Sequence, residues 1–282
     1  MNLAVESYRL WEYLGISGAV KAAKEAGFDA MDWSFYWKAA PELCGDDYLE
    51  KAAEIRNALE KYDMKCTQAH APFDFAWGMK QDASCFEYLS ICRAIEACGI
   101  IGIDRIVVHG VAVPETAVSK QNLEFNYDYY KKLEPLCEKY GVGIAVENLA
   151  SAFTYPDLLN EIIRRLDSPY FTALVDVGHA WLRANIQPGE FIRRLTPGTL
   201  RGLHIHDNHG AAYGVDEHLA PYLGTLDFDD MLKALKETGY DGDFTLEVPR
   251  FLKMYADHGL LIPALKFSCE VGRKMMSDLE AL

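Results

Sequence analysis

The sequence predicts a single (β/α)8 TIM barrel, an α/β fold, and three observations support this prediction. Short apolar runs alternate with amphipathic segments eight times along the 282 residues, which is the element order of a parallel barrel. No linker rich in Pro, Gly or Ser and no shift in composition divides the chain, so we expect residues 1–282 to form one domain. No GxGxxG turn follows any strand, which disfavours the rival fold, an open doubly wound sheet.

The first half of the chain contains four of the predicted strands and their helices. Apolar runs predict strands at residues 2–5, 28–33, 64–70 and 105–109. Helical spacing of apolar residues predicts helices at residues 17–26, 46–62, 82–98 and 123–140. Gly27, Gly99 and Gly141 follow three of these helices and are expected to end them, and Pro135 is expected to kink the fourth helix.

The second half repeats this alternation. Apolar runs predict strands at residues 143–147, 171–176, 200–205 and 244–248. Helices are expected at residues 156–166, 188–195 and 228–238, with a closing helix from about residue 260 onward. Pro188 suits the first turn of a helix, and Asp227 and Gly239 suit the two ends of the helix at 228–238.

Composition limits the compartment and the partners. The chain is 50% apolar with a mean hydropathy of −0.09, and no apolar run approaches the roughly 18 residues of a membrane helix, so we expect a soluble protein. The formal net charge of −14, without clustered Lys or Arg, weighs against nucleic acid as a partner, because neutralising phosphates supplies much of such affinity. The seven cysteines form no CxxC pair and no signal peptide is recognisable, which together predict the cytoplasm.

The segment LHIHDNHGAAYGVDEH, from Leu203 to His218, holds four of the eight histidines. Strand alternation places His204 and His206 on the same side. Asp216 and His218 are one residue apart and can project together from an extended loop. Imidazole and carboxylate groups are ligands for Zn, Mn and Co. Taken alone, His204, His206 and His209 could equally be ordinary polar residues of a strand end and a turn.

The other strand ends favour a metal centre. From the third strand onward, each predicted strand ends in a residue type that can bind a metal. These residues are His70, His109, Glu147, Asp176, His204 and Glu247. The carboxyl ends of barrel strands meet at one rim, and such groups are costly to bury unless they are paired or bind a metal. His179 follows Asp176 by three residues and can face the same centre.

Aromatic side chains are frequent in the loops expected around this rim, and they suit the ring of a sugar or a cyclic polyol. They are Trp33, Phe35, Tyr36, Trp37, Phe73, Phe75, Trp77 and Trp181. Ordinary loop packing would explain each of them equally well. The basic residues near the rim are Lys38, Lys80, Arg183 and Arg250, which is few for a surface that binds duplex DNA.

The sequence resembles the xylose-isomerase-like TIM barrel superfamily in a set of short segments: HAPF, VVHG, VEN, VDVGHA, HIHDN, DEH and LEV. That group includes sugar phosphate isomerases and epimerases, inosose dehydratases and the apurinic (AP) endonuclease family 2 barrels. The resemblance spans nearly the whole chain. It implies that Glu147, Asp176, His204 and Glu247 are the primary metal ligands, and that Glu147 and Glu247 also act as acid and base.

The resemblance leaves two branches open. The epimerase branch has a substrate-contacting histidine at the position of His179, but it usually has an arginine shortly after the histidine of strand seven. Here Asp207 is followed by Asn208, His209, Gly210 and Ala211, so that arginine is absent. The endonuclease branch has a trinuclear zinc site, and its additional ligands match His70, His109, His179, Asp216 and His218.

We therefore predict a metal-dependent isomerase or epimerase of carbohydrate metabolism, acting on a sugar, a sugar phosphate or a cyclic polyol. A divalent ion (Mn, Co, Mg or Zn) would stabilise the enediolate that forms when a glutamate removes a proton next to the carbonyl. The residues expected to contact the substrate are His70, His109, His179, Trp33, Phe73 and Trp181, and those of a second metal site are His179, Asp216 and His218.

The same residues are compatible with three alternative functions. The first is a keto-sugar dehydratase or lyase, because the same intermediate can lose a β-substituent. The second is a trinuclear-zinc phosphodiesterase of the apurinic endonuclease type. The third is a barrel that binds a ligand without turnover. We expect the partner to be a small molecule and expect no association with a membrane. A homo-oligomer is compatible with the sequence.

Overall fold

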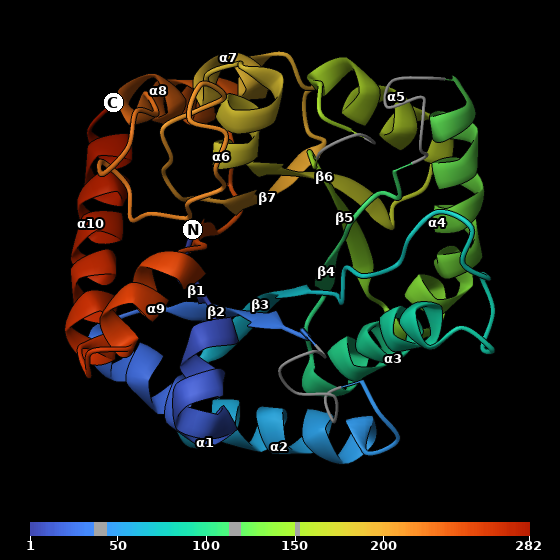
Figure 1. Ribbon diagram of the computed structural model, residues 1–282, viewed down its shortest axis with the longest axis horizontal. Helices are drawn as coiled ribbons and strands as arrows, with labels where there is room; N and C mark the ends of the chain where they lie inside the picture. The colour runs from blue at the N-terminus through green and yellow to red at the C-terminus, as the bar shows by residue number, and fades with distance from the viewer. Residues whose placement is uncertain (37–43, 113–119, 150–152) are drawn as a thin grey trace.

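Eight parallel strands form the barrel, and the computed structural model describes residues 1–36, 44–112, 120–149 and 153–282 (Figure 1). The strands are β1 (Leu3–Glu6), β2 (Ala30–Ser34), β3 (Lys65–His70), β4 (Arg105–Val108), β5 (Gly143–Glu147), β6 (Phe171–Asp176), β7 (Leu200–His204) and β8 (Phe244–Leu246). Their order in the sheet is β7-β6-β5-β4-β3-β2-β1-β8. This is the strand order of a (β/α)8 barrel, as predicted.

The barrel closes between β7 and β8 through Ile205. This residue forms a parallel bridge with Leu246, its N–H donates to the Thr245 carbonyl at 2.8 Å, and its own carbonyl accepts from the Glu247 N–H at 3.0 Å. The closure brings the ends of β7 and β8 together, so that His204 and Glu247 become neighbours.

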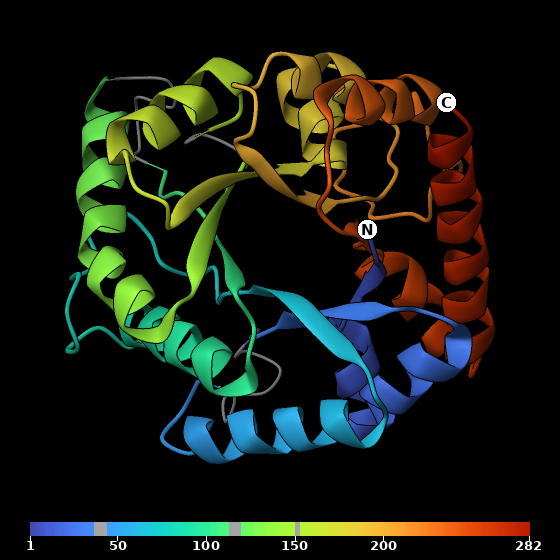
Figure 2. The same ribbon diagram turned by 180° about the vertical axis from the view of Figure 1, so that it is seen from behind.

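Helices surround the strands as an outer ring, and the view from behind shows the same arrangement (Figure 2). The helices are α1 (Tyr8–Ala26), α2 (Tyr48–Lys61), α3 (Phe86–Ile101), α4 (Lys120–Tyr140), α5 (Pro156–Leu166), α6 (Val177–His179) continuing into the π-helix η2 (Ala180–Ala184), α7 (Pro188–Arg193), α8 (Phe228–Thr238), α9 (Pro249–Ala256) and α10 (Leu261–Ala281). Within the described residues, no helix is both long and apolar enough to cross a membrane.

The predicted boundaries of β5, α5, β6 and α8 agree with the structure, and Asp227 caps α8 by accepting from the Asp230 N–H. The prediction for α3 is wrong at its end, because Gly99 lies inside the helix and Gly102 ends it with a φ of 92°. A Cβ on Gly99 would lie 3.0 Å from the Cβ of Tyr140, so this glycine allows α3 to pack closely on α4.

Two further differences concern α1 and the segments near the rim. The first helix begins at Tyr8 rather than at residue 17, and it contains one non-helical residue, Gly15, with a φ of 69°. The short helices α6 and α9, which directly follow Asp176 and Val248, were not expected from the sequence.

Alternation along the strands divides the barrel interior into layers. Val107, Ala145 and Leu174 form a small apolar cluster separate from the main core, which lies between strands and helices. Two residues further along β5 and β6 come Glu147 and Asp176, on the same face of the sheet. The apolar layer therefore supports a polar layer at the carboxyl ends of the strands.

Replacing Gly202 in β7 should destabilise the barrel. A Cβ there would lie 2.6 Å from Gln68 Oε1 and 2.8 Å from Leu174 Cδ1, and Gln68 cannot move freely because its amide is hydrogen-bonded to Asp32. We expect Gly202→Ala to lower the free energy of unfolding by about 1–3 kcal/mol, measured by urea denaturation. Gly143→Ala in β5 is the control, because no atom lies closer than 3.4 Å to its added Cβ. Equal stability of the two variants would contradict this view of the interior.

Candidate metal centre

Imidazole and carboxylate side chains converge inside the rim of the barrel. Glu147, Asp176 and His204 are at most 1% exposed. Groups of three or four of these residues place one ligand atom each within 4.8 Å of one another, and the groups share members. Their members are His70, His109, Glu147, Asp176, His179, His204, His206, Asp216, His218 and Glu247. All six predicted strand-end residues are among them.

The first group joins β3, β4 and β5. His109 Nε2 lies 2.8 Å from Glu147 Oε2 and 3.0 Å from His70 Nε2. His70 Nδ1 lies 2.8 Å from the Ala71 carbonyl, so it carries the proton and leaves Nε2 facing Glu147. Burial raises the pKa of Glu147, but the interactions with His109, His179 and His70 outweigh burial and hold this pKa well below its usual value.

The second group joins β7 and β8. His204 Nδ1 lies 3.3 Å from Glu247 Oε2, and its Nε2 lies 3.0 Å from Asp32 Oδ2. Gln68 donates to the same Asp32 oxygen at 2.6 Å. Asp32 and Gln68 thus hold the His204 ring with Nδ1 directed at Glu247. A carboxylate behind a histidine is the usual support of a metal-binding imidazole.

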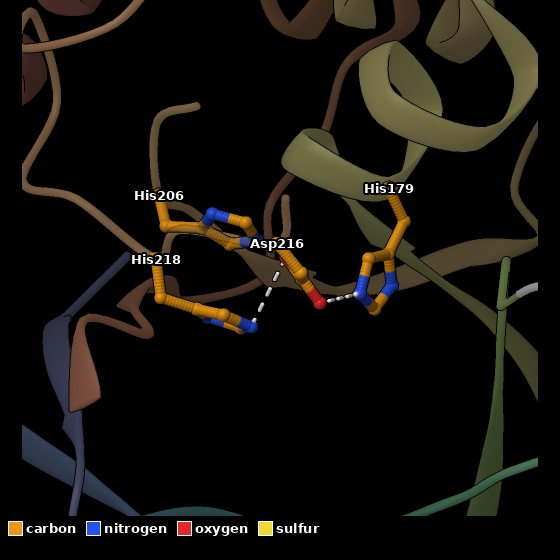
Figure 3. Close-up of side chains that lie close together, drawn as sticks. All are labelled: His179, His206, Asp216 and His218. Atoms are coloured by element: carbon orange, nitrogen blue, oxygen red, sulfur yellow. Dashed lines mark hydrogen bonds and ion pairs between the residues drawn. The ribbon is translucent and has the colours of Figure 1, made fainter. Parts of the chain in front are cut away.

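The third group consists of His179, His206, Asp216 and His218, and Asp216 lies between two of the histidines (Figure 3). Asp216 Oδ2 is 3.1 Å from His179 Nε2, and Asp216 Oδ1 is 3.4 Å from His218 Nε2. Burial raises the pKa of Asp216, but the interactions with His179 and His218 outweigh burial and hold the pKa far below the usual value.

His206 belongs to this third group, although the sequence left it open as an ordinary strand-end residue. It is fully buried, its Nε2 lies 3.0 and 3.1 Å from the two carboxylate oxygens of Asp176, and its ring stacks on that of His218 with 3.9 Å between centroids. Gly178 makes room for this ring, since a Cβ there would lie 2.0 Å from His206 Cε1. His209, by contrast, is exposed and pairs with Glu217.

The donor atoms suit a divalent cation. Four buried atoms among these side chains lie within 3.4 Å of an imidazole or carboxylate atom of another residue but form no well-aligned hydrogen bond, which leaves them available to a ligand or ion. They are Glu147 Oε2, His179 Nδ1, His204 Nδ1 and Asp216 Oδ1. The four residues implied as primary ligands do not form one group of their own. Glu147 and Asp176 share a group with His179, Asp176 and Glu247 share one with His206, and His204 and Glu247 share one with His70.

A pocket of about 340 Å³ opens beside these groups. Its lining residues are Glu6, Tyr8, Arg9, Ser34, Tyr36, His70, Phe73, His218, Glu247, Pro249 and Arg250. Phe73 and Tyr36 stack with 4.8 Å between ring centroids and form one wall. The pocket therefore combines candidate metal ligands with an aromatic surface.

The other predicted aromatic contacts have different surroundings. Trp33 is fully buried in the hydrophobic core and has no surface to offer a substrate, because odd-numbered residues of β2 face the helices. Trp181 is partly buried and donates from Nε1 to Thr225 Oγ1 at 3.0 Å. Phe35 and Phe75 are core residues, whereas Trp77 is exposed. Trp37 and Lys38 lie outside the described residues.

Glu6 is a pocket residue that was not predicted from the sequence. It ends β1 and is 4% exposed, its Oε1 accepts from the Tyr8 N–H at 2.6 Å, and its Oε2 has no partner. Burial, reinforced by the charge of Asp32, raises the pKa of Glu6 to about 8 despite that hydrogen bond. Applying the strand-end criterion to the first strand would have found it.

Removing the carboxylate behind His204 should weaken metal binding. We expect Asp32→Asn to reduce the affinity for Mn²⁺ or Zn²⁺ by roughly 10–100-fold, measured by calorimetry or chelator competition. Asp63→Asn is the control, because the Asp63 side chain is fully exposed and distant from the barrel interior. An Asp32→Asn protein that binds the metal as tightly as the wild type would rule out this role.

The buried Glu6 should make stability depend on pH in the metal-free protein. Its folded-state pKa of about 8 lies above the ordinary value of 4.5, so its contribution is fully present below pH 4.5 and is lost as the pH rises through 8. Relative to Glu6→Gln, the wild type should lose up to about 1.4 kcal/mol of unfolding free energy per pH unit in this window. Urea denaturation in EDTA at several pH values measures the difference, and parallel curves would contradict the assignment.

Comparisons with known proteins identify the family and the fold. A family profile described as "Xylose isomerase-like TIM barrel" matches residues 20–267. The L-ribulose-5-phosphate 3-epimerase UlaE of Shigella boydii serotype 18 is 25% identical over 246 residues, which cover 81% of this chain and 80% of that protein.

Two solved structures share the fold. A D-tagatose 3-epimerase-like protein has a TM-score of 0.71 and 26% identity, with 96% of this chain and 99% of the other covered. The IolI protein with a bound zinc atom has a TM-score of 0.74 and 18% identity, with 99% and 98% covered. Because the family profile spans most of the chain, this protein belongs to the xylose isomerase-like TIM barrel family.

Proposed function

We propose that this protein is a metal-dependent isomerase or epimerase of a sugar or cyclic polyol, and that it transfers a proton at a carbon next to a carbonyl. The observation that carries this proposal is the placement of Glu147 and Glu247. They come from β5 and β8, and each shares a group of ligand atoms with Asp176 beside a pocket with an aromatic wall. Two carboxylates at one centre can exchange a proton with the same substrate carbon.

The residues that would hold the metal are Glu147, Asp176, His204 and Glu247. A bound divalent cation (Mn, Co, Mg or Zn) would supply positive charge that polarises the substrate carbonyl. His179, Asp216 and His218, joined by His206, would hold a second ion. The buried atoms of Glu147, His179, His204 and Asp216 that form no well-aligned hydrogen bond support both assignments.

The protein side chains carry the proton. One glutamate removes it from the carbon next to the carbonyl, and the other returns a proton. Return to the opposite face of the same carbon gives an epimer, and return to the neighbouring carbon gives an isomer. The stacked rings of Tyr36 and Phe73 limit the access of water. Loss of a β-substituent would instead give a dehydratase or lyase.

The comparisons support sugar chemistry, since one relative acts as an L-ribulose-5-phosphate 3-epimerase and one structural neighbour is described as D-tagatose 3-epimerase-like. The zinc atom of the IolI protein supports a metal in this fold. Because Asn208, His209 and Gly210 replace the usual arginine after β7, this chain must hold its substrate by other residues. A cytoplasmic location and a homo-oligomer stay predictions.

A second candidate is a trinuclear-zinc phosphodiesterase of the apurinic endonuclease type. It is favoured by the third group, which adds ligands beyond those that a single metal ion needs. The net charge of −14 opposes it, because a DNA duplex would approach a strongly negative protein.

Solvent-deuterium exchange tests the proposed function. We expect the metal-loaded protein to incorporate deuterium into at least one member of a panel of ketoses and inososes, detected by mass spectrometry. Glu147→Gln and Glu247→Gln should each lower the exchange rate by at least about 100-fold, since each removes an acid–base group. Glu138→Gln, at an exposed position of α4, should leave it unchanged.

Metal analysis separates the two candidates. Exchange by a protein holding one or two metal ions supports the isomerase or epimerase. Three zinc ions per chain with cleavage of a duplex at an abasic site, and no exchange, would establish the phosphodiesterase instead.

A further inference from the structure

Glu6 is a pocket carboxyl that the proposed proton transfer does not use. It belongs to none of the candidate metal-binding groups found among the described residues, yet it lines the same pocket as His70, His218 and Glu247. Its Oε2 is buried without a hydrogen-bond partner. A buried carboxyl oxygen without a partner costs free energy that a bound hydroxyl group can recover.

The backbone around Glu6 is held rigidly. The Ser7 N–H donates to the Asp32 carbonyl at 2.9 Å, and Ser7 Oγ accepts from the Ser34 N–H at 2.9 Å. With Oε1 fixed by the Tyr8 N–H, only Oε2 is available for a further contact. Glu6 therefore presents a pre-positioned group rather than a flexible one, which reduces the entropy lost on binding.

A continuous aromatic surface joins Glu6 to the metal centre. Tyr8 packs edge-on against Tyr36 at 5.2 Å between centroids, Tyr36 stacks on Phe73, and Phe73 lies 5.4 Å from the ring of His109. A substrate whose carbonyl lies at the candidate metal ligands can extend along these rings. Its far end then reaches Glu6.

The neighbouring charges favour a hydroxyl group at this end. Arg9 and Arg250 line the pocket, and Arg9 Nη1 is paired with Glu12 Oε2, whereas the buried Arg9 Nε has no partner and can also donate to a bound hydroxyl group. Burial raises the pKa of Glu6 to about 8, so the carboxyl is mainly protonated at neutral pH and can donate as well as accept. A neutral carboxylic acid and an alcohol satisfy each other's hydrogen-bonding capacity.

We propose that Glu6 binds the substrate by hydrogen-bonding a hydroxyl group at a carbon remote from the reacting ones, so that the pocket selects a polyhydroxylated chain or ring. This inference rests on the proposed function for the orientation of the substrate. It adds the residue that recognises the unreactive end.

Matched ligands test this inference apart from catalysis. The probes are hexitols, which have no carbonyl and cannot react, and their terminal-deoxy analogues, bound to the Mn²⁺-loaded protein and followed by calorimetry. For the wild type, the preferred hexitol should bind at least about 10-fold more tightly than its deoxy analogue, because the analogue leaves the buried oxygen unpaired. In Glu6→Met, which keeps the volume but removes the hydrogen bond, the two ligands should bind within about 2-fold of each other.

Two further variants control for folding. Glu6→Gln keeps a donor and an acceptor and should retain most of the preference for the hexitol. Glu25→Gln, at an exposed position of the same helix that follows β1, should behave like the wild type. Thermal unfolding and metal content are measured for each variant, so a general loss of structure is recognised.

The outcomes separate this inference from the proposed function. A wild type that binds no hexitol, or an equal preference in the wild type and Glu6→Met, overturns the role of Glu6. A preference that depends on Glu6, in a protein that exchanges no deuterium into any ketose or inosose, supports the hydroxyl site and contradicts the isomerase or epimerase.

Discussion

The burial of carboxylates beside imidazoles at the rim of the barrel is the constraint on which the rest of the structure depends. Glu147 and Asp176 are almost completely removed from water, where an isolated charge would be very costly. Histidines offset this cost, since His109 and His179 lie within 2.9 Å of the Glu147 oxygens and His206 within 3.1 Å of both oxygens of Asp176. The strands can end in these residues only because several of them converge.

This constraint extends one layer below the rim. His204 can direct Nδ1 at Glu247 because Asp32 holds its other nitrogen, and Asp32 is in turn fixed by Gln68. The Gln68 amide has room because position 202 carries no side chain. The candidate site is therefore not a set of loops placed on an independent scaffold. Its supporting hydrogen bonds pass through the barrel interior, so stability and ligand geometry share the same residues.

Much of this arrangement follows from sequence pattern, and the exceptions have physical causes. Strand periodicity and residue type predicted the barrel and the convergence of His70, Glu147 and Glu247, because parallel strands bring their carboxyl ends to one rim. The pattern did not separate His206 from a turn residue, since its partner Asp176 lies thirty positions away. Asp32 was missed because it lies two residues before its strand ends, and Trp33 was assigned to the rim although strand alternation turns it toward the helices.

Gly178 gives this architecture an evolutionary consequence. The glycine on α6 and the imidazole of His206 occupy one shared volume, since even a methyl group at position 178 would overlap the ring. Gly178 therefore cannot gain a side chain while position 206 keeps its imidazole. Across barrels of this family, a bulkier residue at position 178 should accompany a smaller one at position 206. The two positions are therefore expected to covary, although they belong to different βα units.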